Sequence, residues 1–151
     1  GAAGAESLAQ SVTAYRAALT IRTKADYSVQ WAMTQNNLGN ALSEQGTRTD
    51  GAAGAELLAQ GVAAYHAALT IRTKADHPVQ WAKTHGNLAY AELAIADHDS
   101  TDDPAPHVRA ALAYVEAALT VFDLVHMSYD YSTATTLRDE INARIAGGGA
   151  V

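Results

Sequence analysis

Residues 1–26 read GAAGAESLAQSVTAYRAALTIRTKAD, and residues 51–76 read GAAGAELLAQGVAAYHAALTIRTKAD. Aligned at an offset of 50 without a gap, the first 50 residues and the next 50 are identical at 30 positions. Ala-Ala-Leu-Thr recurs at this offset, at residues 17–20, 67–70 and 117–120. The chain therefore contains two close copies and one degenerate copy of a unit, at residues 1–50, 51–100 and 101–146. Such a period is the signature of a repeat architecture.

The first half of each copy is predicted to be a helix. Its apolar residues step by four, three and four positions, which places them on one helical face. In the first copy this face contains Leu8, Val12, Tyr15 and Leu19. The predicted helix spans residues 5–23.

The second half of the copy predicts another helix, over residues 29–45. Ser28 can cap its start, and Gly46 suits its C-terminal end. The second copy repeats both helices, with Pro78 at a first helical turn. The third copy predicts helices near residues 106–125 and 129–146. Six helices and no strand make the chain all-α.

Three segments lie outside these helices. Gly-rich GAAGA at 51–55 is expected to act as a hinge, residues 100–104 to join the second copy to the third, and residues 147–151 to form a flexible tail. A helix pair of this size cannot bury its apolar face alone, so successive pairs are expected to stack. The sequence thus predicts a single domain over residues 1–151, an α-solenoid of antiparallel helix pairs.

Composition limits the possible functions. The chain is 48% apolar, lacks cysteine and has a formal net charge of −6, which disfavours nucleic acid and anionic membrane surfaces as partners. No apolar run approaches the roughly 18 residues of a membrane span. The compartment is not determined by these properties, and a cytoplasmic location is favoured.

The first two copies carry a family resemblance, which is weak in the last third of the chain. Trp31–Leu42, reading WAMTQNNLGNAL, with Gly46 beyond it, resembles the first helix of a tetratricopeptide repeat, and Ala14–Leu19 resembles the second helix. The standard repeat has about 34 residues, so this is an extended variant, similar to the longer repeats of kinesin light chains, which bind cargo peptides. The resemblance implies a right-handed solenoid that serves as a protein- or peptide-binding scaffold.

The resemblance also implies where a partner binds, because the first helix of each tetratricopeptide unit lines a concave groove. The groove residues expected here are Met33, Asn36, Asn37, Asn40, Lys83, Asn87 and Tyr90. Asn offers both a donor and an acceptor to a peptide backbone. We expect Asn36 and Asn40 to face solvent or ligand, because the second copy replaces them by Gly86 and Tyr90. Alternatively, exposed positions have simply drifted, and Asn37 and Asn87 hold the helices in register.

Some repeats of this family hold a C-terminal carboxylate with a Lys and Asn clamp. Asn40 and Asn87 match that clamp, but the cation positions contain Asn36, Thr133 and Leu137. A C-terminal carboxylate ligand is not expected.

Acidic and histidine residues cluster between the second and third copies, as Asp97-His98-Asp99 and Asp102-Asp103 with His107. Their spacing matches neither a helical His pair nor a calcium loop. A solvated linker in which Asp102 or Asp103 caps the next helix explains the cluster without a metal. No phosphate loop, nucleophile elbow or dinucleotide fingerprint occurs, so we expect no cofactor and no catalysis.

Two recurring features are expected to be structural. Trp31, Trp81 and Tyr131 occupy one repeat position and are interpreted as packing anchors. Basic residues near helix C-termini are interpreted as complements of the helix dipole. These are Arg22, Lys24, Arg72 and Lys74.

Three functions remain open from the residues. A peptide-binding scaffold is the leading hypothesis. In the order of the resembled family, the chain opens on a second-type helix, so a self-associating or helix-exchanging module cut from a longer array is the alternative. An enzyme or metal protein that uses the Asp/His linker is the least favoured.

Overall fold

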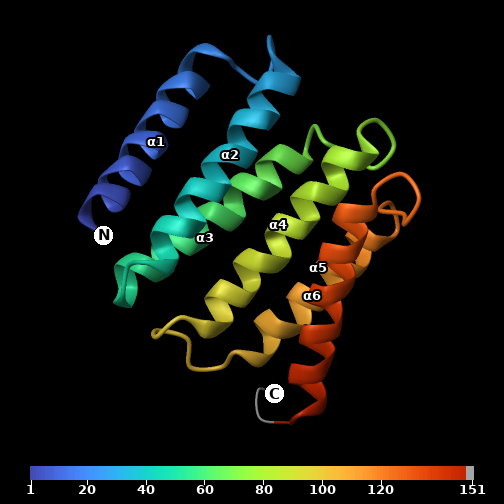
Figure 1. Cartoon of the computed structure of the whole chain (residues 1–151). Coiled ribbons are helices and arrows are strands. Elements are labelled where there is room, and N and C mark those ends of the chain that lie inside the picture. The colour runs from blue at the N-terminus through green and yellow to red at the C-terminus, as the bar shows by residue number, and fades with distance from the viewer. Residues whose placement is uncertain (149–151) are drawn as a thin grey trace. The chain divides into compact units, whose positions relative to one another are not determined.

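The computed structural model describes residues 1–148, and these residues form six α-helices in an all-α arrangement (Figure 1). The helices are α1 (Ala2–Ile21), α2 (Ser28–Thr47), α3 (Gly51–Leu69), α4 (Pro78–Asp97), α5 (Ala105–Leu119) and α6 (Ser128–Ala146). The even-numbered helices begin at residues 28, 78 and 128. The 50-residue period of the sequence is therefore also the period of the structure in this half of each copy.

The chain divides into two compact units. The first contains Gly1–Thr73 with His98–Ser100, and the second contains Lys74–Asp97 with Thr101–Val151, described as far as residue 148. Consecutive helices pack as antiparallel pairs in each unit, α1 with α2 and α2 with α3 in the first, and α4 with α5 and α5 with α6 in the second. The single domain expected from the sequence stays a prediction.

In the first unit, α2 packs closely on α3 because glycines face the neighbouring helix. A Cβ atom on Gly39 would lie 2.6 Å from Cε1 of Tyr65, and one on Gly46 would lie 2.8 Å from Cγ of Leu58. The core of this unit also includes Val12 of α1, the one buried residue of that helix. Val12, Leu38, Ala41, Leu42 and Ala64 form the core cluster.

In the second unit, α5 is the central helix, and alanines again allow a close approach. Its buried side chains face small residues of α4 on one side and larger ones of α6 on the other. Residues from α5 are Val108, Ala111, Val115 and Ala118; those from α4 are Ala82, Ala89 and Ala96; those from α6 are Ala134, Leu137 and Ile141.

The prediction of a hinge at residues 51–55 is wrong. GAAGA forms the first turns of α3, because alanine has the highest helix propensity and both glycines have specific places. Gly51 has φ +69°, which favours glycine, and its N–H donates to the Asp99 carboxylate at 3.0 Å. Gly54 is buried against the Thr49 carbonyl and His98. A Cβ would not fit there.

Other helix ends partly match the predictions. Pro78 begins α4, as expected, whereas Ser28 does not cap α2 but is its first residue. Gly46 does not end α2; it is buried inside the last turns. The Asp103 carboxylate accepts a hydrogen bond from the Ala105 N–H at 3.1 Å, as predicted for the start of α5.

The third copy departs from its predicted bounds at the end of α5. This helix ends at Leu119 rather than near residue 125, and Asp123 Oδ1 accepts hydrogen bonds from the backbone N–H groups of Val125 and His126. Gly147 follows α6 as its C-cap. The remainder of the predicted tail, residues 149–151, lies outside the described residues. None of the helices in the described part combines the length and hydropathy that a membrane span requires.

Candidate functional site

The groove residues expected from the sequence lie on two helices, in different units. Met33, Asn36, Asn37 and Asn40 lie on α2, and Lys83, Asn87 and Tyr90 lie on α4. Met33 and Tyr90 are exposed, whereas Asn37 and Asn87 are partly buried. Each unit therefore presents its own subset of these side chains.

Asn36 does not face solvent, contrary to the expectation. It is only 8% exposed, because α2 has neighbours on two sides, α1 and α3. The side chain therefore offers little surface to a ligand. The equivalent Gly86 of the second copy is only partly buried, and a Cβ there would meet nothing within 4 Å, so the two copies differ at this position.

Asn40 remains exposed but is engaged by the fold. Its Oδ1 accepts a hydrogen bond from the Tyr65 hydroxyl of α3 at 2.8 Å. Burial raises the pKa of Tyr65 to about 12, so this phenol is a neutral donor at physiological pH. In the third copy the position of Tyr65 contains Val115, which has no hydroxyl group.

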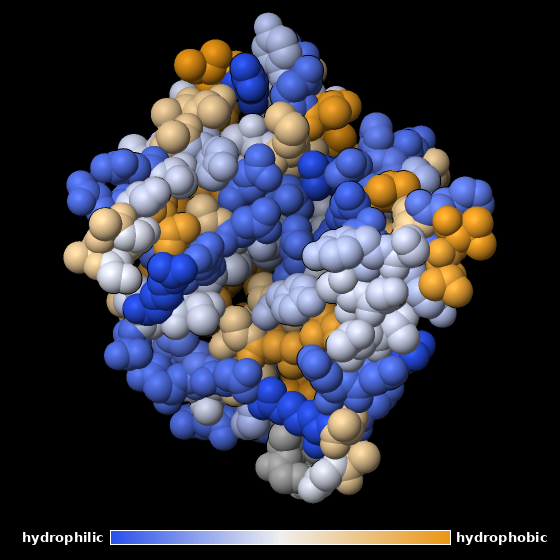
Figure 2. All heavy atoms as spheres, in the orientation of Figure 1, coloured by the Kyte–Doolittle hydropathy of each residue, from blue (hydrophilic) through white to orange (hydrophobic). Residues whose placement is uncertain are grey.

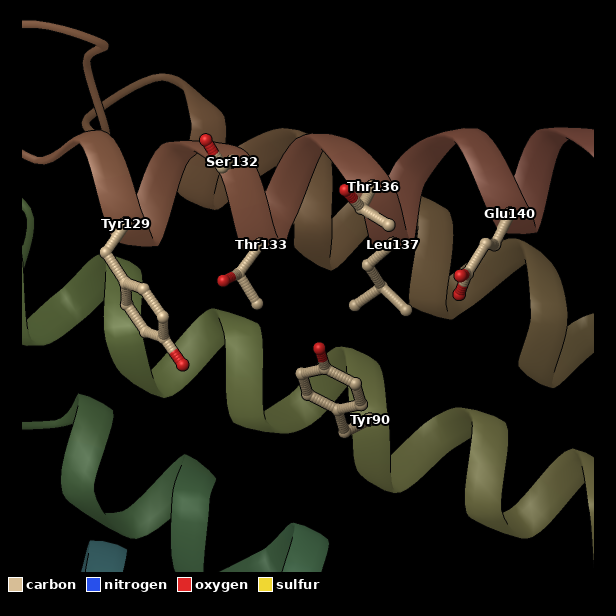
Figure 3. A pocket seen from close by; sticks show the side chains of 7 residues that line it. All are labelled: Tyr90, Tyr129, Ser132, Thr133, Thr136, Leu137 and Glu140. Atoms are coloured by element: carbon tan, nitrogen blue, oxygen red, sulfur yellow. The ribbon is translucent and has the colours of Figure 1, made fainter.

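A pocket of about 360 Å³ lies in the second unit, between α4 and α6. Figure 3 shows Tyr90 rising from α4 toward α6, while Thr133, Leu137 and Glu140 point from α6 toward α4. The lining residues are Tyr90, Tyr129, Ser132, Thr133, Thr136, Leu137 and Glu140. Of the seven groove residues expected from the sequence, the pocket includes Tyr90 alone.

Four of the α6 residues are repeat equivalents of the expected groove residues. Thr133, Thr136, Leu137 and Glu140 follow Met33, Asn36, Asn37 and Asn40 by 100 positions, which is twice the repeat length. The sequence analysis missed them because the third copy retains few identities. The offset itself was the signal that could have located them.

The pocket combines hydroxyl groups, two aromatic rings and one carboxylate. Burial raises the pKa of Tyr90, and the nearby Glu140 and Tyr129 raise it further. Tyr129 is 81% exposed, so the pocket is open on that side. Lys83 of α4 lies with its Nζ 4.0 Å from Asp130 Oδ2 of α6, an ion pair between the two helices that form the pocket.

The recurring aromatic position is a packing position in the second unit, as predicted. Trp81 and Tyr131 pack against the core there. Lys74 Nζ lies 5.2 Å from the centre of the Trp81 ring, and Lys24 lies 5.3 Å from that of Trp31. The two lysines thus make cation–π contacts with the tryptophans, a role that the dipole interpretation did not include.

The Asp/His segment is not a solvated linker throughout. The His98 side chain is only 6% exposed, and its Nε2 donates to the Thr49 carbonyl at 2.9 Å. His107 Nδ1 lies 2.7 Å from Glu92 Oε2 in the second unit. Within residues 1–148, no three His, Asp or Glu side chains are arranged to hold a metal ion.

Comparisons with known proteins give no further identification. No protein-family model, no curated protein and no solved structure matches the chain.

Proposed function

We propose that this chain is a protein- or peptide-binding scaffold without catalytic activity, built as a right-handed solenoid of the tetratricopeptide type. The observation that carries the proposal is the pocket between α4 and α6. It is lined by residues at equivalent positions of successive repeats, Tyr90 and Glu140 among them. A repeat scaffold that presents one helix per unit to its ligand places equivalent positions side by side in this way.

The chemistry of the pocket suits a side chain of a bound polypeptide. Tyrosine contributes apolar contact area with a polar end, and threonine and serine hydroxyls both donate and accept hydrogen bonds. Figure 2 shows hydrophobic groups interspersed with hydrophilic ones on the face that it draws. A partner that inserts single side chains fits such a surface.

A displayed random-peptide library tests the proposal. Peptides enriched on the wild-type chain are expected to lose at least tenfold in affinity for Tyr90→Ala, because this ring forms one wall of the pocket. Tyr27→Ala is the matched control, since Tyr27 and Tyr90 are both 51% exposed and Tyr27 lies in the first unit.

Circular dichroism of both variants establishes that they fold. If no peptide is enriched, or if enriched peptides bind Tyr90→Ala and the wild type equally, the assignment of the pocket as the peptide site is wrong.

A second candidate function, self-association, is favoured by the surface of α1. On α3, Leu58 and Tyr65 are 0% and 3% exposed. Their repeat equivalents on α1, Leu8 and Tyr15, are only partly buried, although the two helices have nearly the same sequence. We propose that a second copy of the chain covers the part of this face of α1 that the core of the first unit leaves exposed.

Light scattering over a wide concentration range tests self-association. The molar mass of the wild type is expected to rise with concentration, and that of Leu8→Asp is expected to stay at the monomer value. Glu6→Gln on the same helix is the control for a change of charge. A wild type that is monomeric at every concentration contradicts this second function.

A further inference from the structure

The pocket between α4 and α6 has an unbalanced set of polar groups. Five hydroxyl groups and one carboxylate line it, together with Leu137, and no Lys, Arg or His is among the lining residues. The hydroxyl groups belong to Tyr90, Tyr129, Ser132, Thr133 and Thr136. All five can accept as well as donate, so the pocket as a whole is rich in acceptors.

The carboxylate of Glu140 is not neutralised by the protein. Within the described chain, Glu140 takes part in none of the ion pairs, although two arginines lie on the same helix. Arg138 is paired with Asp139 at 2.9 Å, and Arg144 with Asp97 at 2.8 Å. The charge of Glu140 therefore remains available to a ligand.

Two aromatic rings line the same pocket as this carboxylate. Figure 3 shows the Tyr90 ring on the α4 side and the Tyr129 ring hanging from α6, with the Glu140 carboxylate at the other end of the pocket. The negative face of an aromatic ring attracts a cation, and a planar guanidinium can both stack on a ring and bind a carboxylate.

Lys83 is a cation of the protein itself near the pocket, and it is paired with a carboxylate other than Glu140. Lys83, on the pocket-forming helix α4, is exposed but lies against Asp130 of α6. The positive charge of Lys83 and the negative charge of Asp130 balance each other. The unpaired charge of the pocket is therefore the negative charge of Glu140.

The repeat position of Tyr90 and Glu140 differs between the two units. The position of Tyr90 and Glu140 contains Asn40 in the first copy, and Asn40 is bonded to Tyr65. In the third copy Val115 replaces Tyr65, and it is fully buried without a hydroxyl group. Tyr90 therefore cannot make the hydrogen bond that Asn40 makes to Tyr65, and its side chain points toward α6.

From this arrangement we propose that the pocket is a subsite for a cationic side chain of the partner, arginine in preference to lysine, held by the Glu140 carboxylate and the ring of Tyr90. This inference rests on the proposed peptide-binding function and names the chemistry of its ligand. A neutral or acidic side chain would leave Glu140 without a counter-charge.

Short capped peptides test the subsite directly. The pentapeptide Gly-Ala-Arg-Ala-Gly is titrated into the protein labelled for NMR, next to peptides in which lysine, citrulline or glutamate replaces arginine. Arginine is expected to shift the amide resonances of the pocket residues and to bind at least tenfold more tightly than citrulline, which has nearly the same shape without the charge. Lysine is expected to fall between them.

Glu140→Gln is expected to reduce arginine binding at least tenfold. Glu116→Gln is the matched control because it removes one exposed carboxylate from α5 of the same unit, outside the pocket, and is expected to bind as the wild type does. Equal binding of the arginine and citrulline peptides, an unchanged affinity of Glu140→Gln, or no shift with any peptide would overturn the inference.

The outcome is separable from that of the proposed function. Library peptides that lose affinity for Tyr90→Ala but contain no enriched arginine or lysine would leave the scaffold in place and refute the cationic subsite. Peptides that carry the enriched cation and lose affinity for Glu140→Gln would support both.

Discussion

The helices α2 and α3 lie close together because glycines at their contact have no side chain. Gly39 and Gly61 bring the two backbones together around Tyr65 and Ser43, because a Cβ on either glycine would overlap a side chain of the partner helix. By contrast, a Cβ on Gly86 of α4 would meet nothing within 4 Å. Glycine is therefore needed for close packing at residues 39 and 61, whereas residue 86 has room for a side chain.

Gly39→Ala is expected to destabilise the protein by about 1–3 kcal/mol, since the added methyl group overpacks against the Tyr65 ring. Gly86→Ala is expected to stabilise it by up to about 1 kcal/mol, because alanine is the better helix former and the space is open. Urea unfolding followed by circular dichroism measures both. A Gly39→Ala variant as stable as the wild type would contradict the close approach.

Ionisation of Tyr65 is expected to make the free energy of unfolding depend on pH in the alkaline range. Its phenol ionises near pH 10 in the unfolded chain and at about 12 when folded, so the unfolded state loses the proton first. The stabilising contribution is complete below pH 10 and is lost as the pH rises toward 12, by about 1–3 kcal/mol.

Unfolding measured at pH 9 and at pH 11.5 is expected to show a smaller loss for Tyr65→Phe than for the wild type, because phenylalanine does not ionise. An equal loss in both proteins would show that Tyr65 is not the group responsible.

Helix termini explain how a glycine-rich segment becomes part of α3. The N-terminus of a helix carries unpaired N–H groups and a partial positive charge, which a carboxylate stabilises. Here the Asp99 side chain comes from the connection after α4 and accepts the Gly51 N–H with both oxygens, at 3.0 and 3.2 Å. His98 and Thr49 hold the same region together through their 2.9 Å hydrogen bond.

Asp99→Ala is expected to weaken the start of α3 by about 1 kcal/mol, the usual loss for a helix cap. Hydrogen exchange of the first amides of α3 measures it locally, and these amides are expected to exchange faster. Asp102→Ala is the control, because Asp102 is exposed in the same connection and caps nothing in the described structure. Unchanged exchange in Asp99→Ala would exclude the capping role.

The complete chain has a formal net charge of −6, and the proposed ligand side chain is positive. Long-range attraction therefore adds to the contact with Glu140, and both are screened by salt. A cationic partner also matches the acidic composition better than nucleic acid or an anionic membrane does.

Raising NaCl from about 0.05 M to about 0.5 M is expected to weaken binding of the arginine pentapeptide roughly fivefold, the equivalent of about 1 kcal/mol for an exposed charge pair. The citrulline peptide is expected to be nearly insensitive. Isothermal titration calorimetry at both salt concentrations makes the comparison, and an arginine affinity that does not change with salt would contradict an electrostatic subsite.

Much of the architecture could be predicted before the structure. The period of 50 residues, six helices, the start of α4 at Pro78 and the packing role of Trp81 all follow from local spacing and from duplication. Spacing of three and four residues is a property of the helix itself, so it can be recognised without knowing the neighbours.

Whether a polar side chain is buried, hydrogen-bonded or exposed depends on contacts between helices. Asn36 is buried between neighbouring helices, so it is not the open groove residue that was expected. Asn40 is exposed, as expected, but it is also bonded to Tyr65, 25 positions away in the sequence. Tyr90 and Glu140 line the same pocket because α4 and α6 lie near each other. Duplication copies a residue into an equivalent place, but the helix that packs against it decides whether its side chain is bonded, buried or available to a ligand.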